Sequence, residues 1–167
     1  MALSADLLAE FDHEMANLRR VLERAPDERW DWRPHPKSRT LGELAAHVAG
    51  LAGWIPGMLE ADAYDLADDG KGATKAIPVT RDAALAAFDA NRAAARAAMV
   101  ARDDAALHAP WALKRDGAIL RTMPKSVALR AFVLDHAIHH RGQLTVYLRL
   151  LDVPVPALYG SSADERM

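Results

Sequence analysis

Three histidines lie within five residues in the last third of the sequence, at positions 136, 139 and 140. They belong to the run Asp-His-Ala-Ile-His-His-Arg-Gly-Gln, and the apolar residues around this run repeat at helical spacing. Side chains four residues apart are neighbours on a helix face, so His136 and His140 form a pair beside Phe132 and Leu144. Two imidazoles one turn apart on a buried face can bind one cation. No glutamate stands between them, which disfavours peptide hydrolysis of the zinc-protease type.

A third histidine, His47, stands in the apolar stripe of an earlier helical segment, in line with Leu44 and Leu51. If this face meets the face of His136 and His140, three ring nitrogens converge in the core. A site of three histidines leaves a coordination position open for water or substrate, which is typical of catalytic metal sites. Zinc, nickel, copper and iron(II) all accept imidazole ligands. The alternative is that the three rings are packed, hydrogen-bonded core residues.

Other side chains near the histidines are candidates for the surroundings of the site. His139 points roughly 60° away from His136 on the helical wheel, which makes it a weaker ligand candidate. Histidine ligands usually donate their second ring N–H to an oxygen. The sequence offers three such oxygens without ranking them, on Asp135, Glu43 and Gln143. The candidates for lining a substrate pocket are Trp54, Trp111 and Tyr147.

Composition limits the classes of function. With 167 residues, of which 51% are hydrophobic and 26% charged, the sequence predicts one globular domain over residues 1–167. The net charge is −2 and no basic tract occurs, so nucleic acid is not expected as a partner. Cysteine is absent, which excludes disulfides, thiolate ligands and a cysteine nucleophile. Without a signal-peptide pattern or an apolar run of about 18 residues, we expect a cytoplasmic protein and no membrane partner.

Four helical segments are expected to position these residues, at about 4–24, 40–59, 80–102 and 124–152. Their starts carry helix-initiating signals, which are Ser4, the capping box from Thr40 to Glu43, Thr80 and Pro124. Between them we expect a linker at 25–39 whose tryptophans close one end of the core, an acidic loop at 60–79, and a β-hairpin within 108–122. The sequence thus predicts an all-α fold, a four-helix bundle with a short β-hairpin before the last helix.

Several of these segments resemble a known family. The stretch Leu-Gly-Glu-Leu-Ala-Ala-His-Val, which ends just after His47, and the stretch His-Ala-Ile-His-His-Arg-Gly-Gln-Leu, which starts at His136, are similar to the DinB/YfiT-like family of damage-inducible-type bacterial proteins. The linker Trp-Asp-Trp-Arg-Pro-His-Pro-Lys-Ser and the closing Asp-Val-Pro-Val-Pro are similar as well. The resemblance therefore spans nearly the whole chain, and His-His-Arg-Gly-Gln is its most specific part.

The resemblance implies a metal-binding four-helix bundle, often a homodimer, in which His47, His136 and His140 hold nickel or zinc. It further implies a thiol S-transferase-like or hydrolase-like activity on a small electrophilic substrate, with a low-molecular-weight thiol such as bacillithiol or mycothiol as cosubstrate. A protein without cysteine must borrow its thiol, and an open metal position can lower the pKa of that thiol. The alternative function is a non-catalytic metal-binding or stress-response module.

Overall fold

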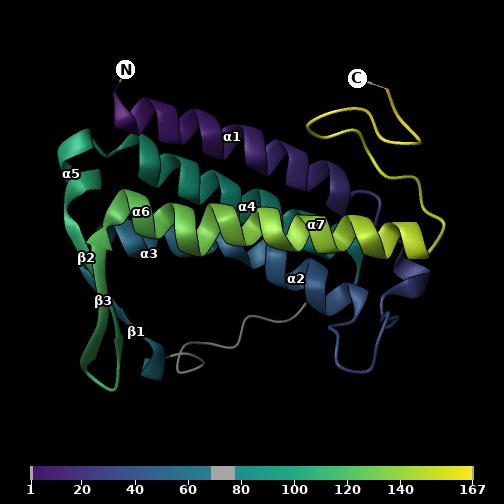
Figure 1. Cartoon of the computed structure of the whole chain (residues 1–167), viewed down its shortest axis with the longest axis horizontal. Helices are drawn as coiled ribbons and strands as arrows, with labels where there is room; N and C mark the ends of the chain where they lie inside the picture. Colours follow the sequence, from purple (N-terminus) through teal and green to yellow (C-terminus); the bar gives the residue numbers. More distant parts are fainter. Residues whose placement is uncertain (1, 69–77, 167) are drawn as a thin grey trace.

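The computed structural model describes residues 2–68 and 78–166 (Figure 1). Four helices lie lengthwise beside one another and supply most of the core. They are α1 (Leu3–Leu22), α2 (Leu41–Leu51), α4 (Arg81–Val100) and α7 (Asp135–Leu150). Helices α1 and α2 each pack against both α4 and α7, so the four helices surround a common core. The prediction of a mostly helical chain is confirmed.

Apolar stripes on these helices explain why they pack as they do. In α1 the side chains of Leu7, Phe11 and Leu18 repeat at helical spacing and are at most 1% exposed. Phe88 of α4 and Leu144 of α7 are buried to the same degree. Full burial of a side chain of this size contributes about 1.5–3 kcal/mol, so these stripes supply much of the free energy that holds the helices together.

The second helical segment is interrupted, whereas the sequence predicts one helix over 40–59. Its capping box forms as expected, because Thr40 and Glu43 exchange two hydrogen bonds of 2.7 and 3.1 Å. After α2 the chain tightens into the 3₁₀ turn η2 (Ala52–Trp54) and continues as α3 (Ile55–Glu60). Pro56 is the physical reason, since it has no N–H to donate to the carbonyl four residues earlier.

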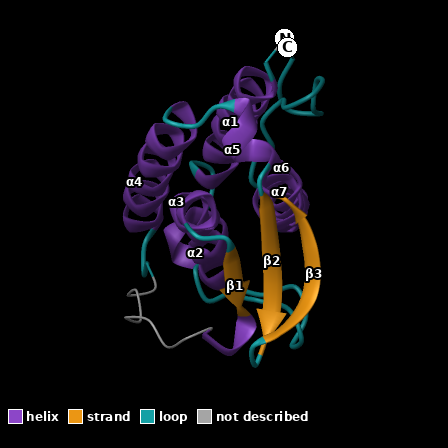
Figure 2. Ribbon diagram, turned by 90° about the vertical axis from the view of Figure 1, so that its left-hand side faces the viewer, coloured by secondary structure: helices purple, strands orange, loops and turns teal. Residues whose placement is uncertain are grey.

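A three-stranded mixed sheet covers one end of the helices (Figure 2). Strands β2 (Pro110–Arg115) and β3 (Ala118–Pro124) are antiparallel, and β1 (Ala63–Asp65) pairs with β2 in parallel. Between β2 and β3, Asp116 and Gly117 have φ angles of 50° and 80°, as a two-residue hairpin turn requires. The hairpin of β2 and β3 follows the short helix α5 (Asp104–His108) in the chain, whereas β1 precedes that helix.

The prediction of a loop over 60–79 is wrong in part, because β1 and the 3₁₀ turn η3 (Leu66–Asp68) lie within this range. The physical reason is tertiary. The carboxylate of Asp65 accepts the N–H groups of Asp116 and Gly117 at 3.0 and 2.7 Å, which fastens β1 to the hairpin turn. A strand of three residues carries no periodicity that could reveal it in the sequence. The rest of the expected loop, residues 69–77, lies outside the described residues.

The last helix contains one wide turn, whereas the sequence predicts a regular helix over 124–152. Helix α6 (Lys125–Leu129) passes into a π-helical turn, η4 (Arg130–Leu134), and then into α7. The N–H of Asp135 bonds to the carbonyl of Arg130, five residues back. The wide turn closes at Asp135, directly before His136, and shifts the helical register there. Turns of this π-helical kind are frequent at functional sites.

The linker before α2 closes the end of the helices opposite the sheet (Figure 1). It includes the 3₁₀ turn η1 (Asp27–Arg29), and both of its tryptophans pack against the core. The ring of Trp32 meets Tyr147 of α7 edge-on at 5.6 Å between centroids. Trp30 lies directly against Gly42 in the first turn of α2. The expectation that the tryptophans close one end of the core is confirmed.

The C-terminal tail returns along α1 and is fixed by a buried ion pair. The guanidinium of Arg141 in α7 donates to the Glu14 carboxylate at 2.7 Å, and the hydroxyl of Tyr159 donates to the same carboxylate at 2.6 Å. Arg141 also bonds to the Tyr159 hydroxyl. Among the described residues, no helix combines the length and the apolar character that crossing a membrane requires.

Candidate metal centre

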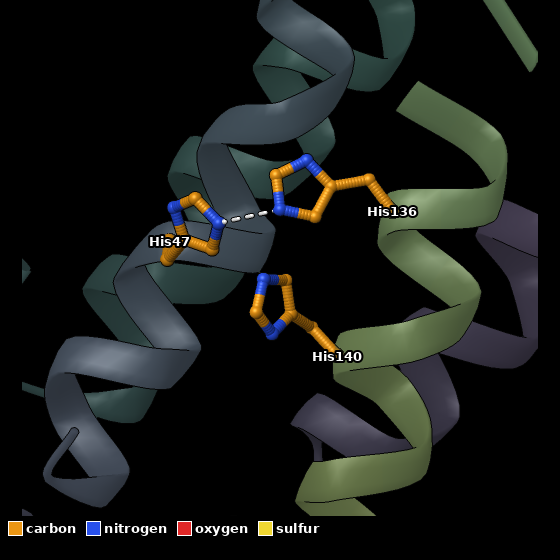
Figure 3. Close-up of side chains that lie close together, drawn as sticks. All are labelled: His47, His136 and His140. Atoms are coloured by element: carbon orange, nitrogen blue, oxygen red, sulfur yellow. Dashed lines mark hydrogen bonds between the residues drawn. The ribbon is translucent and has the colours of Figure 1, made fainter. Parts of the chain in front are cut away.

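The structure brings His47, His136 and His140 together between α2 and α7 (Figure 3). Each offers a ring nitrogen, and these three atoms lie within 4.8 Å of one another. The Nε2 atoms of His47 and His136 are 3.2 Å apart. A tetrahedral ion with metal–nitrogen distances of about 2.0–2.1 Å would hold its ligand nitrogens roughly 3.3 Å apart. The three side chains therefore fit a divalent transition metal with a small adjustment.

Two of the three rings, His136 and His140, have an oxygen at Nδ1. Nδ1 of His140 is 2.7 Å from Oε1 of Gln143, and Nδ1 of His136 is 3.3 Å from the Phe132 carbonyl oxygen. An oxygen at Nδ1 favours the tautomer with its proton there and a lone pair on Nε2, as a metal ligand requires. The Phe132 carbonyl belongs to the π-helical turn, so this turn contributes directly to the orientation of His136.

The surroundings of the cluster favour the neutral form of two of its rings, His47 and His140. Burial, together with the smaller effect of the positive charges of His140, Arg39 and His136, lowers the pKa of His47 to about 4. Burial also lowers the pKa of His140. A neutral imidazole can bind a metal and a protonated one cannot, so these environments favour metal binding at neutral pH.

The other predicted neighbours of the histidines lie in different places. Gln143 contacts His140, as described above. Asp135 and His139 are exposed, although the His139 ring lies 4.9 Å from the His140 ring between centroids. The Glu43 carboxylate bonds to the Thr40 N–H at the start of α2 and serves as a helix cap. The Phe132 carbonyl was not foreseen, because main-chain acceptors leave no mark in a sequence.

An apolar cavity of about 160 Å³ opens onto the cluster between the helices and the sheet. Two of the predicted pocket residues, Trp54 and Trp111, line it together with the rings of His47 and His136. The remaining lining residues are Leu51, Met58, Tyr64, Leu66, Leu113 and Phe132. Trp111 is 3% exposed, and its indole N–H has no hydrogen-bond partner among the described residues. The sheet thus supplies one wall of the cavity.

A second hollow of about 260 Å³ lies on the other side of the cluster, next to His140. It contains the third predicted pocket residue, Tyr147, whose hydroxyl donates to the Arg39 carbonyl at 3.1 Å. The full lining is Lys37, Ser38, Arg39, Leu44, His140, Gln143 and Tyr147. The linker residues in this hollow were missed in the sequence, because their position depends on how the linker folds over the end of α2.

Comparisons with known proteins agree on one family. The model of the DinB family matches residues 1–166. A DinB-like protein from Bacillus cereus ATCC 10987 has a similar structure, with 25% sequence identity, a TM-score of 0.68, and coverage of 92% of this chain and 95% of that chain. The DinB-like protein YjoA from Bacillus subtilis shares the fold at 14% identity, with a TM-score of 0.70 and coverage of 90% and 96%. No curated protein matches the sequence.

Proposed function

The chain belongs to the DinB family, and from this premise we propose that it is a metal-dependent enzyme acting on a small electrophilic substrate. The proposed reaction is thiol S-transfer or hydrolysis, with His47, His136 and His140 holding one divalent ion, nickel or zinc. When bound, such an ion supplies Lewis acidity, which lowers the pKa of a thiol or water at its open position.

The apolar cavity is the observation that supports an enzyme over a metal-binding module without turnover. It opens directly onto His47 and His136, so a substrate in it would lie against the ligand set. Small-molecule sites are typically apolar hollows with a few polar groups, which describes this cavity. The unpaired indole N–H of Trp111 is one such group. Because a buried donor without an acceptor is unfavourable, an acceptor atom on a bound substrate would stabilise this position.

The residues of this chain would orient and shield the reacting groups. Gln143 and the Phe132 carbonyl would hold the rings of His140 and His136 in place through their Nδ1 atoms. The aromatic walls at Trp54, Trp111 and Phe132 would exclude water from the substrate. Both effects come from side-chain and main-chain positions that the structure shows.

Further features of the proposal follow from the resemblance. We interpret the ring of contacts among α1, α2, α4 and α7 as a four-helix bundle. We also propose that the protein is a cytoplasmic homodimer in stress response, takes a small-molecule substrate and a low-molecular-weight thiol, and has no nucleic-acid or membrane partner.

The proposal is tested with protein purified without an affinity tag. Elemental analysis should find about one nickel or zinc per chain, because three imidazoles from two helices form one site. His140→Ala should lose both the metal and the turnover of epoxides or quinones with low-molecular-weight thiols. His139→Ala is the matched control, because it removes the neighbouring exposed histidine, and it should keep both.

Two outcomes would overturn this function. The first is turnover that persists after the metal has been removed with a chelator. The second is a metal-loaded protein that stays inactive against the whole panel of thiols and electrophiles, which would favour a non-catalytic metal-binding module. Circular dichroism of each variant verifies that a lost activity does not reflect a lost fold.

A further inference from the structure

The hollow beside His140, defined above by its seven lining residues, is polar where the cavity at His47 and His136 is apolar. We propose that this hollow binds an anionic group, such as a carboxylate, on the ligand that lies against the three histidines. The inference rests on the proposed function, because it names the chemical class of ligand for the same site. It adds Lys37, Ser38, Arg39 and Gln143 as the residues that recognise this ligand.

The polar side chains that line the hollow all offer hydrogen-bond donors. Lys37 and Arg39 are cationic, and no carboxylate of the described residues lines the hollow. Within the described part of the chain, neither cation makes an ion pair. The pKa of the Glu43 carboxyl is lowered, mainly by the hydrogen bond from the Thr40 N–H and less by the charges of Arg33 and Arg39, but Glu43 does not line the hollow. Two cations that form no ion pair within the described residues favour an anion beside them.

Gln143 connects the hollow to the metal ligands. Its Oε1 atom lies 2.7 Å from Nδ1 of His140 and accepts a hydrogen bond from the N–H there. This bond fixes the orientation of the amide, so that its NH₂ group remains available as a donor. Among the described residues no acceptor contacts that NH₂ group. An anion in the hollow would therefore accept hydrogen bonds from the neutral amide of Gln143 and from the charged groups of Lys37 and Arg39.

The main chain of the linker is held in place, so the cations are not on a loose loop. The N–H groups of Lys37 and Ser38 donate to Nδ1 and to the carbonyl of His35, at 3.1 and 2.9 Å. The Arg39 carbonyl accepts the Tyr147 hydroxyl of α7. These bonds fix the backbone that carries the two cations next to His140.

The two hollows together define a ligand with two ends. An apolar group fits the cavity on the side of His47 and His136, and an anionic group fits the hollow on the side of His140. The atom that lies against the histidines must be between the two ends. A small thiol with a carboxylate a few bonds from its sulfur has this arrangement for the anionic side.

The test compares two thiols of equal chain length, 3-mercaptopropionate and 3-mercapto-1-propanol. Their dissociation constants are measured on cobalt-loaded protein from the absorption change that thiol binding causes. We expect the carboxylate thiol to bind roughly tenfold more tightly, because two partly solvated cations each contribute modestly. The Lys37→Met/Arg39→Met variant should lose this preference and keep the wild-type affinity for the neutral thiol. The Arg29→Met/Arg33→Met variant removes two charges from the same linker outside the hollow and should keep the preference.

Equal affinity for the two thiols, or a preference that survives in Lys37→Met/Arg39→Met, overturns the inference. A second measurement separates it from the proposed function. Succinate is titrated into the metal-free protein while the NMR resonances of the Gln143 side chain are followed. If neither thiol binds, the thiol reaction fails. Succinate shifts that occur in the wild type and vanish in Lys37→Met/Arg39→Met would still support the anion site, and equal shifts in both would overturn it.

Discussion

Arg141 and Gln143 stand two residues apart in α7 and serve opposite sides of the helix. Gln143 contacts His140 and faces the candidate metal centre, whereas Arg141 is 3% exposed and pairs with Glu14 of α1. The sequence motif that contains His136 and His140 therefore has two roles. One part orients ligands and the other part fixes α7 to α1. Substitutions in the same short segment should consequently separate into effects on metal binding and effects on folding.

The half-buried ring of His47 makes the stability of the protein depend on pH when no metal is bound. Its pKa is about 4 in the folded chain and about 6.5 in an unfolded chain. Between these values the unfolded chain binds a proton that the folded chain does not, so the free energy of unfolding falls as the pH falls through this window. With allowance for solvent screening, we expect a loss of about 1–2 kcal/mol from this ring, complete below pH 4.

Urea unfolding in the presence of a chelator at pH 7 and at pH 4.5 measures this loss. His47→Gln should lose less stability than the wild type on acidification, because the titrating ring is gone. His108→Gln, which removes an exposed ring in α5, should show the wild-type loss. An identical loss in the wild type and in His47→Gln would show that this ring is not the group responsible.

At the scale of elements, the first turn of α2 depends on a glycine. A Cβ atom at Gly42 would lie 2.2 Å from Nε1 of Trp30, whose N–H donates to the Pro78 carbonyl at 3.1 Å. The Trp30 carbonyl in turn accepts the N–H of Gly42 at 2.9 Å. Linker and helix are thus in direct contact at a point where no side chain fits. This contact places the linker over the end of α2 that is nearest to the polar hollow.

Gly42→Ala should therefore destabilise the protein by about 1–3 kcal/mol, the usual cost of overpacking, because the indole must move. Urea unfolding followed by tryptophan fluorescence measures both the loss and the movement. Gly50→Ala is the matched control in the same helix, since nothing lies within 4 Å of its added Cβ. It should be neutral or stabilising by up to about 1 kcal/mol through helix propensity. Equal effects of the two substitutions would contradict this account.

The elements differ in how far the sequence predicts them. The long helices follow from apolar spacing, and the pairing of His136 with His140 follows from the same rule. Strand β1 has three residues and depends on contacts with β2, which local sequence does not encode. The sequence does not predict the π-helical turn either, because apolar residues such as Val133 and Leu134 suit an α-helix and a π-helix equally well. Lys37 and Arg39 were missed as site residues, since their position depends on the packing of Trp30 against Gly42.

At the scale of the whole molecule, the buried pair of Glu14 and Arg141 joins α1, α7 and the C-terminal tail. Arg141→Met should destabilise the protein by about 3–5 kcal/mol, because it leaves the Glu14 carboxylate buried without a counter-charge. The double variant Glu14→Leu/Arg141→Met should lose much less than the sum of the single losses, since both charges are then removed. Urea unfolding of the wild type, Glu14→Leu, Arg141→Met and the double variant gives the four free energies of unfolding, and metal content should be the same in all folded proteins. Additive losses would mean that the pair is not coupled.

The three histidines come from parts of the chain that are far apart, and this has a consequence for the order of assembly. His136 and His140 are near each other in any helical α7, but His47 is 89 residues before His136. In the unfolded chain an ion can bind only the local pair His136 and His140. All three ligands come together only after α2 has docked on α7. An ion that binds only the complete set of three histidines stabilises the folded chain. It would do so by cross-linking the two ends of the long segment between His47 and His136. Coordination of the ion by all three rings would then mark the step of folding at which α2 and α7 have come into contact.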